Sequence, residues 1–399
     1  DEGEHFVHVF LNAPGVGKTA LIDHFGRIVE SEKKGLHVSF TCDSSLNSSE
    51  ILNRTMVKAI EDSIDSNLGL IEDFIPANTP EEILEKTKRK YERLKNSFQM
   101  LLDKETITLT EVQELLKDLA RIIPLFFSAD EIQELQKVSF RASGIDGGTE
   151  ASGLHYFTRI IKGLLKSKIL IVLSGTRYHI LSQIGGNIGS PIRQKAKPFH
   201  VYNLEVKAIK EYVARIKMIL KEASLPDKLE LYDPFLENYR RFLRAFSGGH
   251  PRTMVIITEL FLKNLPTFIS MPEYLKYANF MEYLLGKTES YFENTLFTSI
   301  LEGAILSLTG HEGFVHIKEW ILTKSGSGLS LGKRPTVQEN DTLDRDVKNL
   351  VYELMNLGVI VQNGQDNYYL TSYFHLIEFL KVIYAPHQAF LLQVMTNKY

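Results

Sequence analysis

The first half of the chain alternates short apolar runs with longer segments whose apolar residues recur at helical spacing. Each run is bounded by turn or polar residues, which is typical of a strand buried on both faces. The predicted strands are Phe6–Leu11, Leu36–Thr41, the run within Ile122–Leu135 that ends at Asp130, and Lys168–Arg177. The predicted helices between them are Thr19–Glu30, Ser48–Ile64, Glu81–Asp103, Thr110–Ile123 and His155–Lys166. This alternation predicts an α/β fold with a parallel β-sheet between helices.

The segment 48–119 falls between the second and third predicted strands and is helical throughout, so we interpret it as an insert. Its helix Glu81–Asp103 carries many Lys, Arg and Glu residues, but the signs alternate, which is typical of a solvated helix face. The sequence TEVQE predicts that Thr110 begins the next helix as its cap. The Gly/Ser/Thr-rich stretch Phe140–Gly153 predicts a mobile loop after the third strand.

From Phe199 onward the alternation stops and the pattern becomes helical. Helices are predicted over Val206–Ala223, Pro234–Phe246 and Arg252–Leu265, which together form a small helical domain. The sequence FSGGHPR separates the last two of them. Its two glycines end one helix, and its proline suits the first turn of the next.

The last part of the chain has the element order of a winged helix, with helices followed by a two-stranded wing. A hairpin is predicted over Val359–Leu370, turning at Asn363–Asn367, and Ser325–Thr336 is predicted as a loop. The predicted helices are Glu289–Ser307, Glu312–Thr323, Thr342–Leu357 and Tyr373–Tyr384. We therefore expect three domains: an α/β core at 1–200 with the insert 48–119, a helical lid at 201–288, and a winged helix at 289–399.

The length and composition of the chain are consistent with several domains, and they exclude few classes of function. A chain of 399 residues exceeds the size at which one hydrophobic core keeps growing. A net charge of −3 gives no global attraction for nucleic acid, so any such surface is local. The single cysteine, Cys42, cannot form an internal disulfide, which favours a reducing compartment. No apolar run reaches membrane-spanning length. The chain begins DEGEH without Met, which indicates a fragment of a longer protein.

The stretch NAPGVGKT, directly after the first predicted strand, has the form of a phosphate-binding loop. In such a loop backbone N–H groups surround phosphates, the Lys reaches the β- and γ-phosphates, and the Ser/Thr hydroxyl ligates Mg²⁺. Gly15, Gly17, Lys18 and Thr19 match the pattern, whereas Asn12 stands where the pattern has its first glycine. Asn visits the left-handed region more readily than most residues, so we expect it to be tolerated there.

Two adjacent carboxylates end the third predicted strand. Asp130 at this position can hold Mg²⁺ opposite the Thr19 hydroxyl, and Glu131 can act as the base for an attacking water. The fourth strand ends in Ser174, Thr176 and Arg177. Because ligands of parallel sheets lie outside the carboxyl ends of the strands, these polar groups are expected on the same rim.

These motifs in this order resemble the STAND class of P-loop ATPases, relatives of the AAA+ proteins. More narrowly, LNAPGVGKT, FFSADEIQEL, LSGTR and FSGGHPR resemble the NTPase module of Crinkler effectors and retrotransposon-hot-spot proteins. The resemblance implies that His250 and Pro251 lie near the adenine, that Arg252 reaches the phosphates, and that Arg177 senses the γ-phosphate. The nucleotide-binding set then comprises Asn12, Pro14, Gly15, Val16, Gly17, Lys18, Thr19, Ala20, Thr176, His250 and Pro251. The catalytic set comprises Glu131, Arg177 and Arg252, and the metal ligands are Thr19 and Asp130.

The first functional hypothesis is an ATP- and Mg²⁺-dependent switch ATPase that drives the winged helix. The alternative is a DNA-binding winged-helix protein with a regulatory, non-hydrolysing nucleotide site. A third is a scaffold that assembles on binding ATP, through itself or a protein partner. Arg345 and Lys348 on the candidate recognition helix stand among acidic residues, and the only nearby basic cluster is Lys333-Arg334, so a protein partner is favoured over DNA. We expect an intracellular location, cytoplasm or nucleus; a Crinkler-like effector would be secreted and act inside host cells, in the nucleus.

Overall fold

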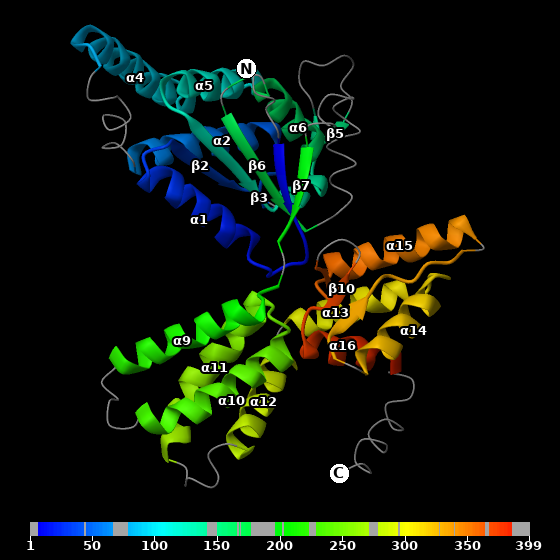
Figure 1. The fold of residues 1–399 in the computed structure, drawn as a ribbon. Helices are drawn as coiled ribbons and strands as arrows, with labels where there is room; N and C mark the ends of the chain where they lie inside the picture. The colour runs from blue at the N-terminus through cyan, green and yellow to red at the C-terminus, as the bar shows by residue number, and fades with distance from the viewer. Residues whose placement is uncertain are drawn as a thin grey trace. The chain divides into compact units, whose positions relative to one another are not determined.

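The computed structural model describes residues 7–43, 45–66, 79–141, 150–165, 167, 169–176, 196–201, 203–222, 229–270, 278–293, 296–326, 328–338, 340–363 and 367–384 (Figure 1). The chain divides into two compact units. The first is made of Asp1–Leu11 and Lys18–Phe199, and the second of Asn12–Gly17 and His200–Tyr399. The six residues of the glycine-rich loop therefore group with the second unit, although the residues on either side of them belong to the first.

The first unit is built on a five-stranded sheet with the order β2-β3-β6-β1-β7. Four of its strands pair in parallel: β2 with β3, β3 with β6, and β6 with β1. Their bounds are Val7–Leu11 for β1, Leu36–Thr41 for β2, Leu125–Asp130 for β3 and Ile169–Gly175 for β6. The predicted α/β fold with a parallel sheet is confirmed. All four of these strands lie in the predicted runs. Burial on both faces selects continuous apolar sequence, as in β3, where every residue is buried, whereas β2 alternates and exposes Ser39 and Thr41.

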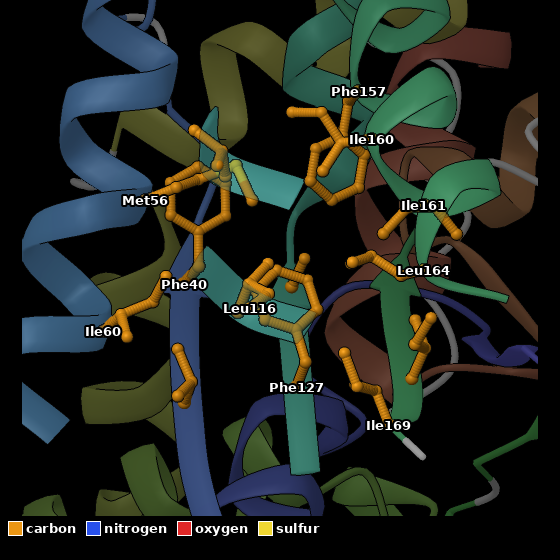
Figure 2. Packing of buried hydrophobic residues seen from close by; sticks show 14 of the residues in the cluster. Phe40, Met56, Ile60, Leu116, Phe127, Phe157, Ile160, Ile161, Leu164 and Ile169 are labelled. Atoms are coloured by element: carbon orange, nitrogen blue, oxygen red, sulfur yellow. The ribbon is translucent and has the colours of Figure 1, made fainter. Parts of the chain in front are cut away.

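Alternate residues of each strand face opposite layers of helices, as the two-residue period of a strand requires. Phe40 and Phe127 enter a core shared with α2 (Ser49–Ser66), α5 (Leu109–Ile122) and α6 (Gly153–Leu164), as Figure 2 shows. Phe126 and Val172 are buried outside this cluster. They belong to the other face, which α1 (Lys18–Ser31) covers in Figure 1. The helix α4 (Glu81–Leu102) completes the inserted helices.

The cap of α5 is Thr108, so the prediction of Thr110 is wrong. The Thr108 hydroxyl accepts a hydrogen bond from the Glu111 N–H, and the Glu111 carboxylate accepts one from the Thr108 N–H at 2.8 Å. A capping box needs an acidic or amide side chain three residues after the cap. For Thr110 that residue is Gln113, whose amide instead donates to the carbonyls of Arg159 and Ile160.

The predicted mobile loop at Phe140–Gly153 is wrong at both of its ends. Strand β4 (Ser139–Arg141) pairs antiparallel with β5 (Glu150–Ser152). Phe140 is buried and its ring meets that of Tyr156 edge-on, at 5.6 Å between centroids. This apolar contact anchors the hairpin base, whereas the Gly-rich residues 142–149 lie outside the described part of the chain.

Strand β7 (Ala196–His200) was not predicted, and a short 3₁₀ helix, Ile132–Gln136, follows β3. The sequence AKPFH of β7 contains a proline, which cannot donate to a sheet ladder. Such a sequence is tolerated at an edge, and β7 occupies the edge beside β1. An edge strand without alternating apolar residues has no local sequence pattern from which it could be predicted.

The second unit begins with three helices: α9 (Val206–Glu222), α10 (Leu229–Ser247) and α11 (Pro251–Ser270). Helix α10 starts five residues before the predicted Pro234, a position within the helix. Pro251 is the first residue of α11, as its fixed φ predicts. The predicted single helix at Glu289–Ser307 is wrong, because α12 (Ala278–Glu293) ends before α13 (Leu296–Leu308) begins.

The rest of the second unit consists of α14 (Phe314–Ser325), β8 (Ser330–Gly332), α15 (Asp341–Asn356), β9 (Ile360–Gln362), β10 (Tyr368–Leu370) and α16 (Tyr373–Tyr384). The three strands form an antiparallel sheet with the order β8-β10-β9. The hairpin lies where it was predicted, but Ser325–Thr336 contains β8 and is not wholly a loop. Leu331 is fully buried, and its carbonyl accepts a hydrogen bond from the Trp320 indole at 2.9 Å. Across the described residues, none of the helices has the length and hydropathy needed to cross a membrane.

Candidate nucleotide-binding site

The glycine-rich loop lies between β1 and α1, the context that a phosphate-binding loop requires. Gly15 and Gly17 have φ of 79° and 93°, in the region that glycine adopts without steric cost. A Cβ on Gly15 would lie 2.8 Å from the His250 ring and 2.9 Å from the Cβ of Arg252, so no other residue fits there without a shift. Consecutive N–H groups in such a turn form an anion-binding concavity.

Asn12 is held by its side chain and not by left-handed backbone. Its φ is 157°, far from the roughly +57° of the left-handed helical region, so the predicted reason for its tolerance is wrong. The side chain is fully buried. Its amide donates to the carbonyls of Val201 at 2.9 Å and Gln362 at 2.8 Å, and its Oδ1 accepts from the N–H of Ala13 at 2.8 Å.

The start of α11 binds the carbonyls of the same loop. The Nε2 atom of His250 lies 2.9 Å from the Pro14 carbonyl oxygen, which can only accept, so Nε2 carries the proton and donates. The backbone N–H of Arg252 donates to the Gly15 carbonyl at 3.2 Å. GGHPR therefore contacts the loop backbone directly. Sequence reasoning placed His250 beside an adenine and missed this contact, which joins residues 236 positions apart.

Within the first unit, hydroxyl and carboxylate groups meet at the carboxyl end of β3. The Thr19 hydroxyl donates to Oδ2 of Asp130. The other carboxylate oxygen of Asp130 accepts from the Glu131 N–H at 2.9 Å. Glu131 itself has a left-handed backbone, φ 54° and ψ 35°, where β3 gives way to the 3₁₀ turn. Asp130 and Thr19 thus come together as predicted from the sequence. Hydroxyl and carboxylate oxygens are the ligands that Mg²⁺ prefers, so this pair fits the ion.

Gln133 is a site residue that sequence reasoning missed. Its side chain is buried, its amide donates to the Glu131 carboxylate, and its Oε1 accepts from the Thr176 N–H at 3.2 Å. It joins the end of β3 to the end of β6. The only sequence signal is its position two residues after Glu131, on the turn that follows the strand.

Replacing Gln133 with methionine is expected to lower the free energy of unfolding by about 1–3 kcal/mol, because a buried N–H and a carboxylate lose their partner. Urea unfolding of the variant measures this effect. Gln99→Met is the matched control, since Gln99 is exposed and its side-chain amide donates to the exposed Asp103 at 3.1 Å. Equal stability of the two variants would contradict the bridging role.

The remaining predicted residues have less defined surroundings. Arg177 lies outside the described residues. The Ser174 hydroxyl is buried at the end of β6 with no hydrogen-bond partner in the described structure. Val16 is buried, whereas Ala20 is exposed on the first turn of α1. Among the described residues no group of three or more His, Cys, Asp or Glu is placed to hold a metal ion. Cys42 is buried, and burial followed by the nearby Asp130 charge raises the pKa of its thiol.

His375 on α16 is wholly buried beside the loop-binding residues. Its ring meets that of His250 edge-on at 5.9 Å, and its Nδ1 lies 2.6 Å from the Ser372 hydroxyl. Burial, and then the charges of His250 and Arg252, lower its pKa from 6.5 to about 3. His375 therefore stays neutral at physiological pH.

This pKa predicts acid sensitivity. Between pH 6.5 and 3 the unfolded chain binds a proton on His375 that the folded chain does not, so stability falls as the pH falls through this window. At about 1.4 kcal/mol per pH unit, roughly 2 kcal/mol is lost by pH 5. Urea unfolding at pH 7 and 5 should show this loss in the wild type and in His311→Asn, an exposed control, but not in His375→Asn. The same pH dependence in all three proteins would contradict it.

Two of the basic residues near the C-terminal sheet, Arg334 and Lys348, have partners in the described structure. Arg334 donates to both carboxylate oxygens of Asp344, at 2.9 and 3.2 Å. This pair holds the pKa of Asp344 below its usual value. The ammonium of Lys348 lies 5.9 Å from the centre of the Tyr352 ring. Arg334 is thus not disposed to contact a phosphate backbone.

No family model matches this chain, and none of the curated proteins matches it in sequence. Solved structures do match. The ADP form of the Aeropyrum pernix ORC2 protein has 11% identity and a TM-score of 0.42, over 96% of this chain and 89% of that one. The structure of the ADPNP–ADP complexes of the same protein has 12% identity and a TM-score of 0.44, over 97% of this chain and 89% of that one. The structure of CDC6P from Pyrobaculum aerophilum has 14% identity and a TM-score of 0.36, over 96% of this chain and 89% of that one. These similarities are distant.

Proposed function

We propose that this chain is a P-loop nucleoside triphosphatase, an ATPase of the STAND/AAA+ type that acts as a nucleotide-dependent switch. The observation that carries the proposal is the contact between Thr19, two residues after the glycine-rich loop, and Asp130 at the end of β3. A loop with two left-handed glycines, followed by a helix, supplies the phosphate-binding half of such a site. The hydroxyl–carboxylate pair supplies the metal-binding half.

Each residue has a distinct proposed role. Lys18, the first residue of α1, binds the β- and γ-phosphates, and Arg252 contributes positive charge from the start of α11. Thr19 and Asp130 hold Mg²⁺, which neutralises phosphate charge when bound. Glu131 accepts the proton of the attacking water, and Gln133 keeps its carboxylate in place. Pro251 and His250 shape the loop that carries the phosphates.

The C-terminal part of the second unit is proposed to be a winged helix that receives the nucleotide signal. Its order, α13, α14, β8, α15, β9, β10, supports this assignment. The engagement of Arg334 by Asp344 favours a protein partner over DNA for this module. Membership of the Crinkler and retrotransposon-hot-spot group, self-association, and action in the cytoplasm or nucleus rest on the sequence resemblance alone.

Two measurements on the purified chain test the proposal. Isothermal titration with ADP and with a non-hydrolysable ATP analogue measures binding, and phosphate release from ATP and Mg²⁺ measures turnover. Binding and turnover are both expected. Binding without turnover would mean that the chain is a nucleotide sensor and not an ATPase, and the lack of binding would overturn the proposal.

Repeating the turnover assay with duplex DNA at several salt concentrations distinguishes a DNA partner from a protein partner. Turnover indifferent to DNA favours a protein, and salt-sensitive stimulation favours DNA.

A further inference from the structure

Asn12 connects the glycine-rich loop to the C-terminal sheet. Its amide hydrogen bond to the Gln362 carbonyl spans 350 positions of sequence, and the Gln362 N–H approaches its Oδ1 at 3.4 Å. A second bond to the Val201 carbonyl spans 189 positions. Since a glycine at this position has no side chain, the usual form of the loop cannot make any of these contacts. The contacts follow from the one position at which this loop departs from the pattern.

The loop also packs on β9 through apolar contacts. Ala13, Val16 and Val361 form a small buried cluster. A Cβ on Gly358, two residues before β9, would lie 3.4 Å from the Pro14 ring, so the Pro14 side chain lies beside this part of the chain. These contacts explain why residues 12–17 group with the second unit although they join β1 to α1. The loop is therefore in direct side-chain contact with β9.

The path continues across the sheet to the single tryptophan. In the β9–β10 register Gln362 lies opposite Tyr368. The Tyr368 ring meets Trp320 edge-on, at 5.8 Å between centroids, and the Trp320 indole is bonded to Leu331 of β8. Trp320 is buried and is the only tryptophan in the sequence. Its fluorescence reports on this sheet without any label.

We propose that Asn12 couples phosphate occupancy of the glycine-rich loop to the three-stranded sheet β8-β10-β9. The inference rests on the proposed function, because it requires a phosphate ligand at the loop. It names the residue that connects the nucleotide site to the sheet. A phosphate aligns the loop N–H groups, and Asn12 transfers the change in backbone position to Gln362. In this coupling the sheet has two arrangements, and the bound nucleotide changes the free-energy difference between them.

The test uses Asn12→Gly, which restores the residue most common at this position of the loop and removes the connection. The wild type and the variant are titrated with ADP and with a non-hydrolysable ATP analogue in Mg²⁺, followed by calorimetry and by Trp320 fluorescence. Calorimetry gives the affinity of each protein for each nucleotide, so the fluorescence changes are compared at concentrations that saturate each protein. The fluorescence change is expected in the wild type and at least about fivefold smaller in the variant, in line with a typical coupling. Asn340→Gly is the matched control: Asn340 caps α15 in the same unit and makes its hydrogen bonds to Thr342 and Leu343.

The outcomes separate this inference from the proposed function. If the wild type binds nucleotide without a fluorescence change, or if Asn12→Gly keeps the full change, the coupling role is overturned and the nucleotide site stands. If calorimetry detects no binding to the wild type, the proposed function fails first. Should Asn12→Gly fail to fold or to bind nucleotide, hydrogen exchange on the wild type decides: nucleotide should alter protection of residues 359–363 but not of the α9 amides. Unchanged protection at 359–363 would overturn the inference.

Discussion

Replacing Lys18 with alanine is expected to weaken ATP and ADP binding by at least about 100-fold, because charge-assisted contacts to phosphate are among the strongest that a side chain makes. Lys18 is the first residue of α1, and only 5% of its surface is exposed. Isothermal titration with each nucleotide measures the loss.

The matched control is Lys34→Ala. Lys34 lies three residues after α1 ends, is exposed, and pairs only with Glu32 at the surface. A surface ion pair of this kind contributes little to stability, so this variant should bind nucleotide like the wild type. Equal affinity of Lys18→Ala and Lys34→Ala would mean that the glycine-rich loop is not a phosphate site, whatever its backbone geometry.

The parts of the site that depend on local sequence could be predicted. The loop follows a strand and precedes a helix because a buried apolar run, a glycine-rich turn and a helical period occur within thirty residues. Asp130 ends β3 because an apolar run gives way there to charged residues. In parallel strands the carboxyl ends share one edge, so the meeting of Asp130 with Thr19 follows from topology.

The parts that depend on distant contacts could not be predicted. Asn12 was interpreted through its backbone preference, whereas its side chain binds Gln362, 350 positions away, and nothing in a local window identifies that partner. The contact of His250 with Pro14 is of the same kind. Gln133 is close to Glu131 in sequence, but its second partner is the backbone of Thr176, just after β6. These roles require tertiary structure.

The prediction of secondary structure missed two strands for a related reason. Strands β7 and β8 are short and lack an apolar alternation, so their pairing partners, not their own sequences, stabilise them. Leu331 supplies the only strongly buried position of β8. Tertiary context overrides local propensity most easily in strands, because their ladder hydrogen bonds and most of their side-chain contacts come from elsewhere in the chain.

Replacing Glu131 with glutamine is expected to reduce kcat for ATP by about 10²–10⁴-fold while nucleotide affinity stays unchanged, the range that general-base catalysis contributes. A glutamine has the size of the glutamate and keeps an oxygen that can accept from the Gln133 amide, so the 3₁₀ turn should be preserved. It lacks the basic carboxylate that would take the proton of the attacking water. Phosphate release measures kcat, and calorimetry measures affinity.

Glu134→Gln is the matched control because Glu134 lies on the same turn and pairs with Lys137 at 2.6 Å, away from the end of β3. Its turnover should equal that of the wild type. The comparison separates chemistry from folding, since each variant removes one negative charge from the same stretch of four residues, 131–134. If Glu131→Gln turns over ATP as fast as Glu134→Gln, the proton is accepted elsewhere, and Glu131 is a structural partner of Gln133 with its strained φ of 54° serving only the turn.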